Sequence, residues 1–163
     1  MEAYHNYENV RFVHESKRSV VWSEISRYLQ RYLLEDSTIL DVGSGYCDFI
    51  NFIKAKKKFA LDKYIEPARF VLEGTIYMFG DSSLLDNKIK NCSLDVAFAS
   101  NLFEHLDEKE LNKYLDVIRK KLSLDRVLMI LQPNYRLCYK NYFDDYTHAK
   151  AWTDYCKKWK IKK

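Results

Sequence analysis

Short apolar runs alternate with segments of helical periodicity along most of this chain. Between Ser16 and Leu34, apolar residues recur every three or four positions with arginines between them, which predicts an amphipathic helix. Strands that alternate with helices favour parallel pairing with right-handed crossovers. Apolar runs of strand length follow at residues 38–42, 59–62, 75–79, 94–99 and 127–131.

Helices are expected between several of these strands. Asp107 and Glu110 have the spacing of a capping box at the start of one helix, and Pro67 suits the first turn of another. Lysines at 54–58 place favourable charge at the C-terminal end of a third. These helices are expected at residues 49–53, 66–72 and 107–122. We therefore predict an α/β fold of three layers, with a Rossmann-like open sheet of about five mostly parallel strands.

Composition limits the classes of protein that need to be considered. With 163 residues, 47% hydrophobic and 31% charged, residues 1–163 are expected to form a single domain. No long apolar run and no N-terminal signal pattern is present, so we expect a cytoplasmic protein without a membrane span. The four cysteines form no Cys-x-x-Cys pair, and we expect no metal site. Much of the net charge of +4 lies in a lysine-rich end, expected to be solvated, so nucleic acid is not the expected partner.

Two of the four glycines stand in one three-residue window, directly after the first predicted strand. This strand carries Asp41 near its end and leads into Gly43 and Gly45. Glycine is used where the backbone turns with positive φ or approaches another group closely. A strand, a Gly-x-Gly turn and a helix form the first unit of a nucleotide-type α/β fold, in which the ligand lies over the turn.

Three of the predicted strands end in a carboxylate or are followed closely by one: Asp41, Asp62 and Asp81. Ligands of open parallel sheets bind beyond the carboxyl ends of the strands, so these acids should converge on one crevice. Asp62 lies about 20 residues beyond the glycine turn, where an acid binds a ribose. Acids at strand ends also cap the helices that follow them. Together with the glycine turn, the three acids favour a nucleoside site.

The residue that follows the glycine turn distinguishes the candidate nucleosides. A dinucleotide fingerprint requires a third glycine three positions after Gly45, where this chain has Asp48. A carboxylate there would repel a pyrophosphate and would itself occupy the amides at the helix N-terminus. A ligand with a ribose, an adenine and a cationic amino-acid end avoids this conflict. S-adenosylmethionine fits that description.

The ordered motifs of residues 16–155 resemble the class I S-adenosylmethionine-dependent methyltransferases. The stretch 40–45 is similar to their first motif, 95–106 to their fourth-strand segment, which includes Asn101, and 132–134 to their segment after strand five. The resemblance implies S-adenosylmethionine as cofactor and S-adenosylhomocysteine as product. It also implies a helix at 16–34, a cofactor-binding core at 38–131 and a substrate-side segment at 132–163. The cofactor-binding residues that it implies are Asp41, Gly43, Gly45, Asp62, Asp81, Ser82 and Asn101.

The chain departs from this family in two respects. Cys47 stands where the family often has a third glycine, and we expect its side chain to pack as a small hydrophobe rather than to react. Only 32 residues follow Leu131, so the C-terminal strands 6 and 7 of the family are expected to be missing or reduced. The fifth strand would then be an exposed edge at which a homodimer could form.

Candidate catalytic residues are His105, in the fourth-strand segment, and His148, in the substrate-side segment. Methyl transfer to a hydroxyl needs removal of a proton, and a histidine titrates near working pH. Both histidines could instead be structural. The tyrosines and paired acids near His148 favour a small-molecule acceptor, in particular a saccharide or glycolipid, although tyrosines at this spacing also form apolar covers.

Three alternatives stay open at this point. The chain could be an inactive or truncated module that binds S-adenosylmethionine, or an RNA methyltransferase, whose affinity would fall steeply with salt. It could also be an NAD-type oxidoreductase, which Asp48 disfavours. The Asn-Pro-Pro-Tyr motif of amino-methylating enzymes is absent after the fourth strand, which further reduces the expectation of a nucleic-acid base as acceptor.

Overall fold

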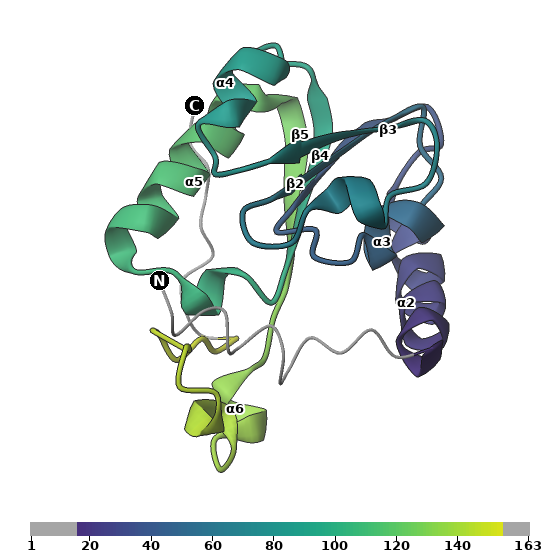
Figure 1. Ribbon diagram of the computed structural model, residues 1–163. Coiled ribbons are helices and arrows are strands. Elements are labelled where there is room, and N and C mark those ends of the chain that lie inside the picture. The colour runs from purple at the N-terminus through teal and green to yellow at the C-terminus, as the bar shows by residue number, and fades with distance from the viewer. Residues whose placement is uncertain (1–15, 155–163) are drawn as a thin grey trace.

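The computed structural model describes residues 16–154 and contains one five-stranded sheet with helices on both faces (Figure 1). The strand order is β3-β2-β1-β4-β5, and all neighbouring strands pair in parallel. The strands are β1 (Thr38–Val42), β2 (Lys57–Asp62), β3 (Thr75–Phe79), β4 (Leu94–Ser100) and β5 (Leu122–Leu131). The predicted α/β fold with a parallel, Rossmann-like sheet of five strands is confirmed.

The helices form the two outer layers. On one face lie α2 (Ser16–Leu29) and α3 (Asp48–Phe52), and on the other lie α4 (Leu84–Lys88) and α5 (Glu108–Lys121) (Figure 1). The short α6 (Tyr135–Cys138) lies beyond the sheet, after β5. None of the described helices is long and apolar enough to cross a membrane. Short 3-10 turns occur at Gln30–Tyr32 (η1), Pro67–Arg69 (η2), Phe103–His105 (η3) and Tyr142–Asp144 (η4).

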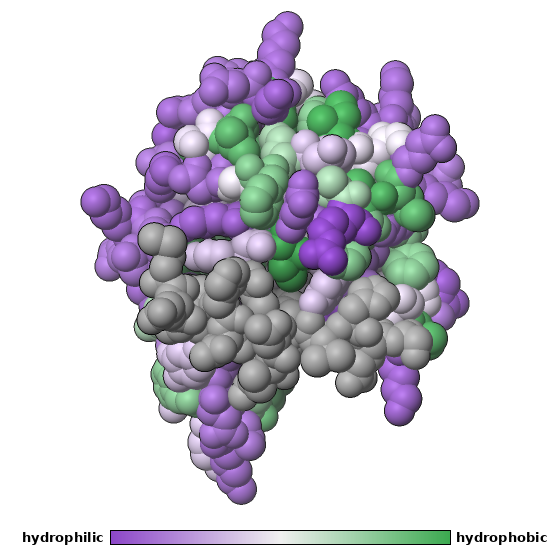
Figure 2. Space-filling view, in the orientation of Figure 1, coloured by the Kyte–Doolittle hydropathy of each residue, from purple (hydrophilic) through white to green (hydrophobic). Residues whose placement is uncertain are grey.

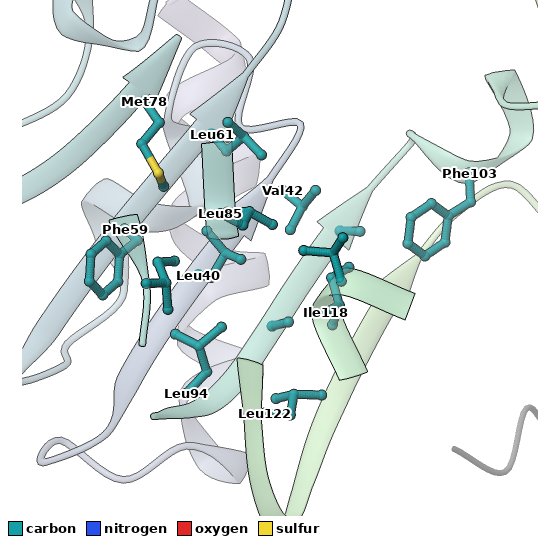
Figure 3. Close-up of a cluster of buried hydrophobic side chains, with 14 of the residues drawn as sticks. Leu40, Val42, Phe59, Leu61, Met78, Leu85, Leu94, Phe103, Ile118 and Leu122 are labelled. Carbon is teal, nitrogen blue, oxygen red and sulfur yellow. The ribbon is translucent and has the colours of Figure 1, made fainter. Parts of the chain in front are cut away.

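The sheet separates two apolar cores because successive side chains of a strand point to opposite faces. In β1, Ile39 packs on the α2–α3 side, whereas Leu40 and Val42 pack on the α4–α5 side (Figure 3). Both faces of the central strands are therefore covered, which explains why β1 reads as a continuous apolar run.

Several predicted elements differ in extent. The first helix ends at Leu29 and continues only as η1, and the segment after Pro67 forms η2 instead of a helix to residue 72. The side-chain amide of Asn51 donates to the Phe70 carbonyl at 2.9 Å and accepts from the Leu72 N–H at 2.9 Å. These bonds satisfy backbone groups that a longer helix would have paired internally.

The connection from α5 to β5 is shorter than predicted. β5 begins at Leu122, directly after the helix, so it includes residues 123–126, which separate the predicted helix from the predicted strand. These residues form an irregularity in the pairing with β4. Leu122 pairs with Leu94 before it, and Val127 pairs with Val96 after it. Asp125 adopts φ 59° there. Aspartate tolerates this conformation better than most residues do, so the chain turns without a glycine.

Candidate functional site

A cavity of about 570 Å³ opens at the carboxyl edge of the sheet. Its walls come from the ends of β1, β2, β3 and β4, from α2 and α5 and from the segment that follows β5. All nine residues proposed from the sequence line it, namely Asp41, Gly43, Gly45, Asp62, Asp81, Ser82, Asn101, His105 and His148. The structure therefore places the predicted cofactor residues and the predicted catalytic residues around a single cavity.

The glycine turn forms one wall. Gly43 and Gly45 have φ values of 70° and 50°, which only glycine adopts freely. A Cβ atom on Gly43 would lie 3.1 Å from the Leu102 side chain, whereas one on Gly45 would meet nothing within 4 Å. Gly43 is therefore needed for packing, and Gly45 keeps its wall of the cavity open.

Cys47 occupies a position that requires left-handed backbone geometry, with φ 60°. Glycine adopts this conformation more easily than cysteine does, which explains why the methyltransferases that this motif resembles often have a glycine at this position. The side chain is fully buried in the core of the α2–α3 face. Burial raises the pKa of the Cys47 thiol to about 12, so the thiol stays protonated and unreactive at neutral pH.

Asp41 and Asp62 lie close enough to interact electrostatically, and both are almost completely buried. Burial, together with the nearby charges of Asp62 and Asp48, raises the pKa of Asp41 well above its usual range. Asp62 accepts hydrogen bonds from the backbone N–H groups of Gly45, Tyr64 and Ile65, each at 2.8 Å. This end of the cavity thus has a negative potential that a cationic ligand would relieve.

Asp48 has a different role from the predicted one. It is the first residue of α3, and its carboxylate accepts a hydrogen bond from Arg18 Nε of α2 at 2.6 Å. The expectation that this carboxylate would occupy the helix N-terminal amides is therefore wrong. Arg18 balances one of the three carboxylates at this end, so Asp41 and Asp62 still favour a cation over a pyrophosphate.

The opposite wall follows β3. Asp81 accepts hydrogen bonds from the backbone N–H and hydroxyl of Ser83, which lower its pKa, and it forms a 3.5 Å ion pair with Lys113 of α5. Ser82 is buried, and its hydroxyl has no hydrogen-bond partner among the described residues. Buried hydroxyl groups normally have a partner, so this orphan is suited to a ligand in the cavity.

At the far end of the cavity, η3 follows β4 and carries two titratable side chains. Asn101 makes the turn with φ 47° and donates its N–H to the Leu131 carbonyl at 2.9 Å. Glu104 is completely buried, and burial raises its pKa to about 7. Its backbone carbonyl accepts from the Ala149 N–H at 2.7 Å, which fastens the segment after β5 to η3.

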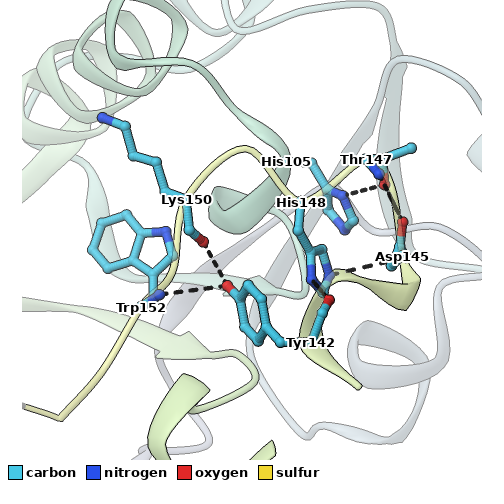
Figure 4. Close-up of polar contacts among 7 residues, drawn as sticks. All are labelled: His105, Tyr142, Asp145, Thr147, His148, Lys150 and Trp152. Carbon is cyan, nitrogen blue, oxygen red and sulfur yellow. Dashed lines mark hydrogen bonds and ion pairs between the residues drawn. The ribbon is translucent and has the colours of Figure 1, made fainter. Parts of the chain in front are cut away.

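This contact brings the two predicted catalytic histidines together. The rings of His105 and His148 lie 4.9 Å apart, although the residues are distant in sequence. His105 Nδ1 lies 2.8 Å from the Thr147 hydroxyl, which also donates to Asp145, and His148 Nδ1 lies 2.6 Å from the Tyr142 carbonyl (Figure 4). Burial and the neighbouring His148 lower the pKa of His105, so its ring is neutral at neutral pH.

Several residues at the site were not predicted from the sequence. Glu104 lies within the fourth-strand motif at 95–106, and Arg18 is one of the arginines between the apolar positions of the first helix, but the sequence marks neither as a site residue. Asp145 was expected only as one of the paired acids near His148, and Thr147 lies in a segment without regular secondary structure, so no periodicity marks it. Only the fold, which returns this segment to η3, shows that they belong to the site.

No protein-family model matches the sequence, and no curated protein matches it significantly. Solved structures do match in fold. A S-adenosylmethionine-dependent methyltransferase from Archaeoglobus fulgidus superimposes with a TM-score of 0.64 and 22% identity over 82% of this chain and 63% of its own length. A methyltransferase from Thermotoga maritima gives a TM-score of 0.65 and 19% identity over 88% of this chain and 72% of its own.

A third similar structure contains ligands. The phosphoethanolamine N-methyltransferase 1 of Haemonchus contortus, in complex with phosphoethanolamine and S-adenosylhomocysteine, matches with a TM-score of 0.52 and 20% identity over 64% of this chain and 25% of its own. The chain thus spans less than two thirds of the length of both the Archaeoglobus and the Haemonchus proteins. It has the fold of the class I S-adenosylmethionine-dependent methyltransferases.

Proposed function

We propose that the protein is a S-adenosylmethionine-dependent methyltransferase. The observation that carries this proposal is the pair of buried carboxylates, Asp41 and Asp62, on either side of the glycine turn. S-adenosylmethionine has a cationic amino group and a sulfonium but no phosphate, so this charge pattern suits it better than a dinucleotide. Similar structures that contain S-adenosylhomocysteine support the assignment.

The residues around the cavity fit the parts of this cofactor. An ionised carboxylate accepts about four hydrogen bonds, and Asp62 receives three from the backbone, which leaves one position for a ribose hydroxyl. Asp41 and the glycine turn would hold the methionine end. Asp81 and the unpartnered Ser82 hydroxyl would contact the adenine. Asn101 would line the methyl-transfer end, where β4 ends.

The chemistry requires few groups from the protein. When bound, S-adenosylmethionine supplies a methyl carbon already activated by the sulfonium. The cavity has to align the acceptor with that carbon and to exclude water. For a hydroxyl acceptor a proton must also leave, and we infer that His105 and His148 promote its removal.

For the acceptor we propose a small molecule with several hydroxyl groups, such as a saccharide or the sugar head of a glycolipid. The acceptor end presents polar side chains to the cavity, including Asn141, Asp145 and Thr147, which suit hydroxyl groups. The negative potential of the cavity disfavours polyanions, which makes RNA the weaker candidate. Tyr142 is not a stacking platform, because it is buried and its hydroxyl donates to the Lys150 carbonyl at 2.6 Å.

We also propose that the exposed edge of the sheet at β5 pairs two copies of the chain. Among the described residues no strand follows β5, and Leu124, Val127 and Ile130 are exposed along it. An unpaired apolar edge favours association.

The cofactor assignment is tested by calorimetry with S-adenosylhomocysteine. We expect binding by the wild-type chain and at least about tenfold weaker binding by Asp62→Asn, because an amide cannot accept from both the backbone and the ribose as a carboxylate does. Asp36→Asn is the matched control, since Asp36 is exposed just before β1. Tighter binding of NAD than of S-adenosylhomocysteine would overturn the proposal.

Activity is tested separately, with S-adenosylmethionine labelled at the methyl group and panels of saccharide, glycolipid and RNA acceptors. Label transfer to a saccharide is the expected result. Transfer to RNA alone, with affinity that falls steeply with salt, would replace the acceptor assignment. Cofactor binding without transfer to any acceptor would identify an inactive binding module.

A further inference from the structure

The carboxylate of Glu104 is an anomaly that cofactor binding does not explain. Its side chain is completely buried, and neither carboxylate oxygen has a hydrogen-bond partner among the described residues. Buried acids are almost always paired, hydrogen-bonded or bound to a metal, because desolvation of an isolated carboxylate is costly. Glu104 lines the acceptor end of the cavity, so a group in the cavity could satisfy it.

Two imidazole rings stand beside this carboxylate. Glu104, His105 and His148 each offer one ligand atom, and the three atoms lie within 4.8 Å of one another. Ligand atoms about 2.0–2.2 Å from a metal ion are at most about 4.4 Å apart, so side-chain shifts of a few tenths of an ångström would bring all three to binding distance. An ion at their centre would satisfy the buried carboxylate.

The hydrogen bonds of the two histidines fix which ring nitrogen can bind an ion. The Thr147 hydroxyl donates to Asp145, so it accepts from His105 Nδ1 (Figure 4). His148 Nδ1 donates to the Tyr142 carbonyl. In its neutral form each ring therefore carries its proton on Nδ1 and its lone pair on Nε2. Metal-binding histidines commonly have this arrangement, in which one nitrogen donates to a carbonyl or a polar side chain and the other binds the ion.

We propose that Glu104, His105 and His148 bind a divalent transition-metal ion of the Zn²⁺ or Mn²⁺ type. Two imidazoles and one carboxylate suit such ions, whereas Ca²⁺ and Mg²⁺ prefer oxygen ligands. Three protein ligands leave further coordination positions open, and all three ligand residues line the cavity. The ion would thus lie where the acceptor binds.

The role of the ion in the reaction rests on the proposed methyltransferase function. A hydroxyl of the acceptor that binds to the ion has a lowered pKa and loses its proton to water more readily. Its oxygen then forms the bond to the methyl carbon as the carbon–sulfur bond breaks, and the electron pair stays on the sulfur. The two histidines promote loss of the proton as metal ligands and do not accept it themselves. The site selects acceptors with a hydroxyl, and above all those with two adjacent oxygens that can bind the ion together.

Metal binding is tested on the whole chain after dialysis against a chelator. Titration with Mn²⁺, followed by the electron paramagnetic resonance of the free ion, and with Zn²⁺, followed by calorimetry, should show one site per chain. We expect Glu104→Gln and His148→Asn to weaken binding at least about tenfold, as is usual when a ligand is lost. Glu73→Gln is the control, because Glu73 is exposed and remote from the cavity. Unchanged Mn²⁺ and Zn²⁺ binding in both ligand variants, or no binding by the wild-type chain, overturns the proposal.

Two further measurements distinguish loss of the metal site from loss of folding and from loss of cofactor binding. Circular dichroism and S-adenosylhomocysteine affinity should stay unchanged in at least one of the two ligand variants, which shows that it is folded. Methyl transfer at an unchanged rate in excess chelator would overturn the metal site but leave the methyltransferase function intact. Metal binding without any methyl transfer would support the metal site and contradict the proposed reaction.

Discussion

Asp41 is the residue at which stability and ligand binding are most clearly opposed. The raised pKa of Asp41 means that the folded state favours the protonated carboxyl. The protonated carboxyl therefore contributes its full stability below the pKa that Asp41 has in the unfolded chain. This contribution is lost as the pH rises through the pKa that Asp41 has in the folded protein. At neutral pH, where this carboxyl is ionised in the unfolded chain, the burial of Asp41 therefore destabilises the unliganded protein. A cationic ligand would remove this penalty, which is typical of binding sites.

The first prediction concerns Asp41→Asn. We expect a higher melting temperature for the unliganded protein at pH 7, by about 2–4 °C for each kcal/mol of repulsion relieved, together with at least about tenfold weaker binding of S-adenosylhomocysteine. The stabilisation should shrink as the pH falls towards the ordinary pKa of an aspartate, because the carboxyl is then protonated in both the folded and the unfolded wild-type chain. Thermal unfolding at several pH values and calorimetry measure both effects. A variant that is less stable at pH 7 would contradict this assignment of charge.

Cys47 gives a second prediction at this scale. With its pKa raised to about 12 and its side chain buried, Cys47 should resist iodoacetamide in the native protein at pH 8, whereas the exposed Cys92 should react. Peptide mapping by mass spectrometry distinguishes the two. Alkylation of Cys47 as fast as that of Cys92 would show that the turn around it opens readily, and equal labelling in denaturant is the control.

Among the helices, α5 has the clearest local signal for its start. Asp107 accepts a hydrogen bond from the Glu110 N–H at 2.8 Å, so the N-cap predicted from the sequence is present. Asp107→Ala should lower the free energy of unfolding by about 1 kcal/mol, measured by urea denaturation. Asp107→Asn, which preserves an N-cap acceptor, should stay within a few tenths of a kcal/mol of wild type. Equal losses in both variants would show that the negative charge, rather than the cap, is what matters.

Strands were easier to predict than helices in this chain. β1 and β3 have the predicted bounds, because a buried strand reads as an apolar run whatever its neighbours are. β2 begins two residues earlier than predicted, because Lys57 and Lys58 pair with β1. Lys58 still serves the end of α3, since its ammonium group reaches the carbonyls of Ile50 and Ile53. The prediction that a lysine places positive charge at the C-terminal end of α3 was therefore correct, although Lys58 belongs to β2.

At the scale of the whole molecule, topology decides what the sequence reveals about the site. The acids at or just beyond the carboxyl ends of β1, β2 and β3 could be predicted to converge, because parallel strands present these ends at one edge. The cluster of Glu104, His105 and His148 could not, because it depends on a segment without periodicity that returns to η3 through the bond between Ala149 and Glu104. Cysteine spacing, on which the expectation of no metal was based, carries no information about such a cluster.

The edges of the sheet give the last prediction. Hydrophobic side chains gather on the face shown in Figure 2, over the part of the molecule where Figure 1 places β3. Of the β3 residues, Ile76, Tyr77 and Phe79 have exposed side chains. The sheet therefore has two apolar edges, of which β5 is the longer strand and the one that we propose to pair.

Val127→Lys and Ile130→Lys together should convert a dimer of the 163-residue chain into a monomer, because two copies would bring these charges close to one another across the edge. Light scattering after size-exclusion chromatography measures the mass directly, at several protein concentrations. Ile76→Lys with Phe79→Lys is the matched control at the opposite edge, and it should leave the dimer intact. If only this second pair produces the monomer, association occurs through β3. A wild-type chain that is monomeric at every concentration would show that the twist and irregularity of β5 already protect its edge.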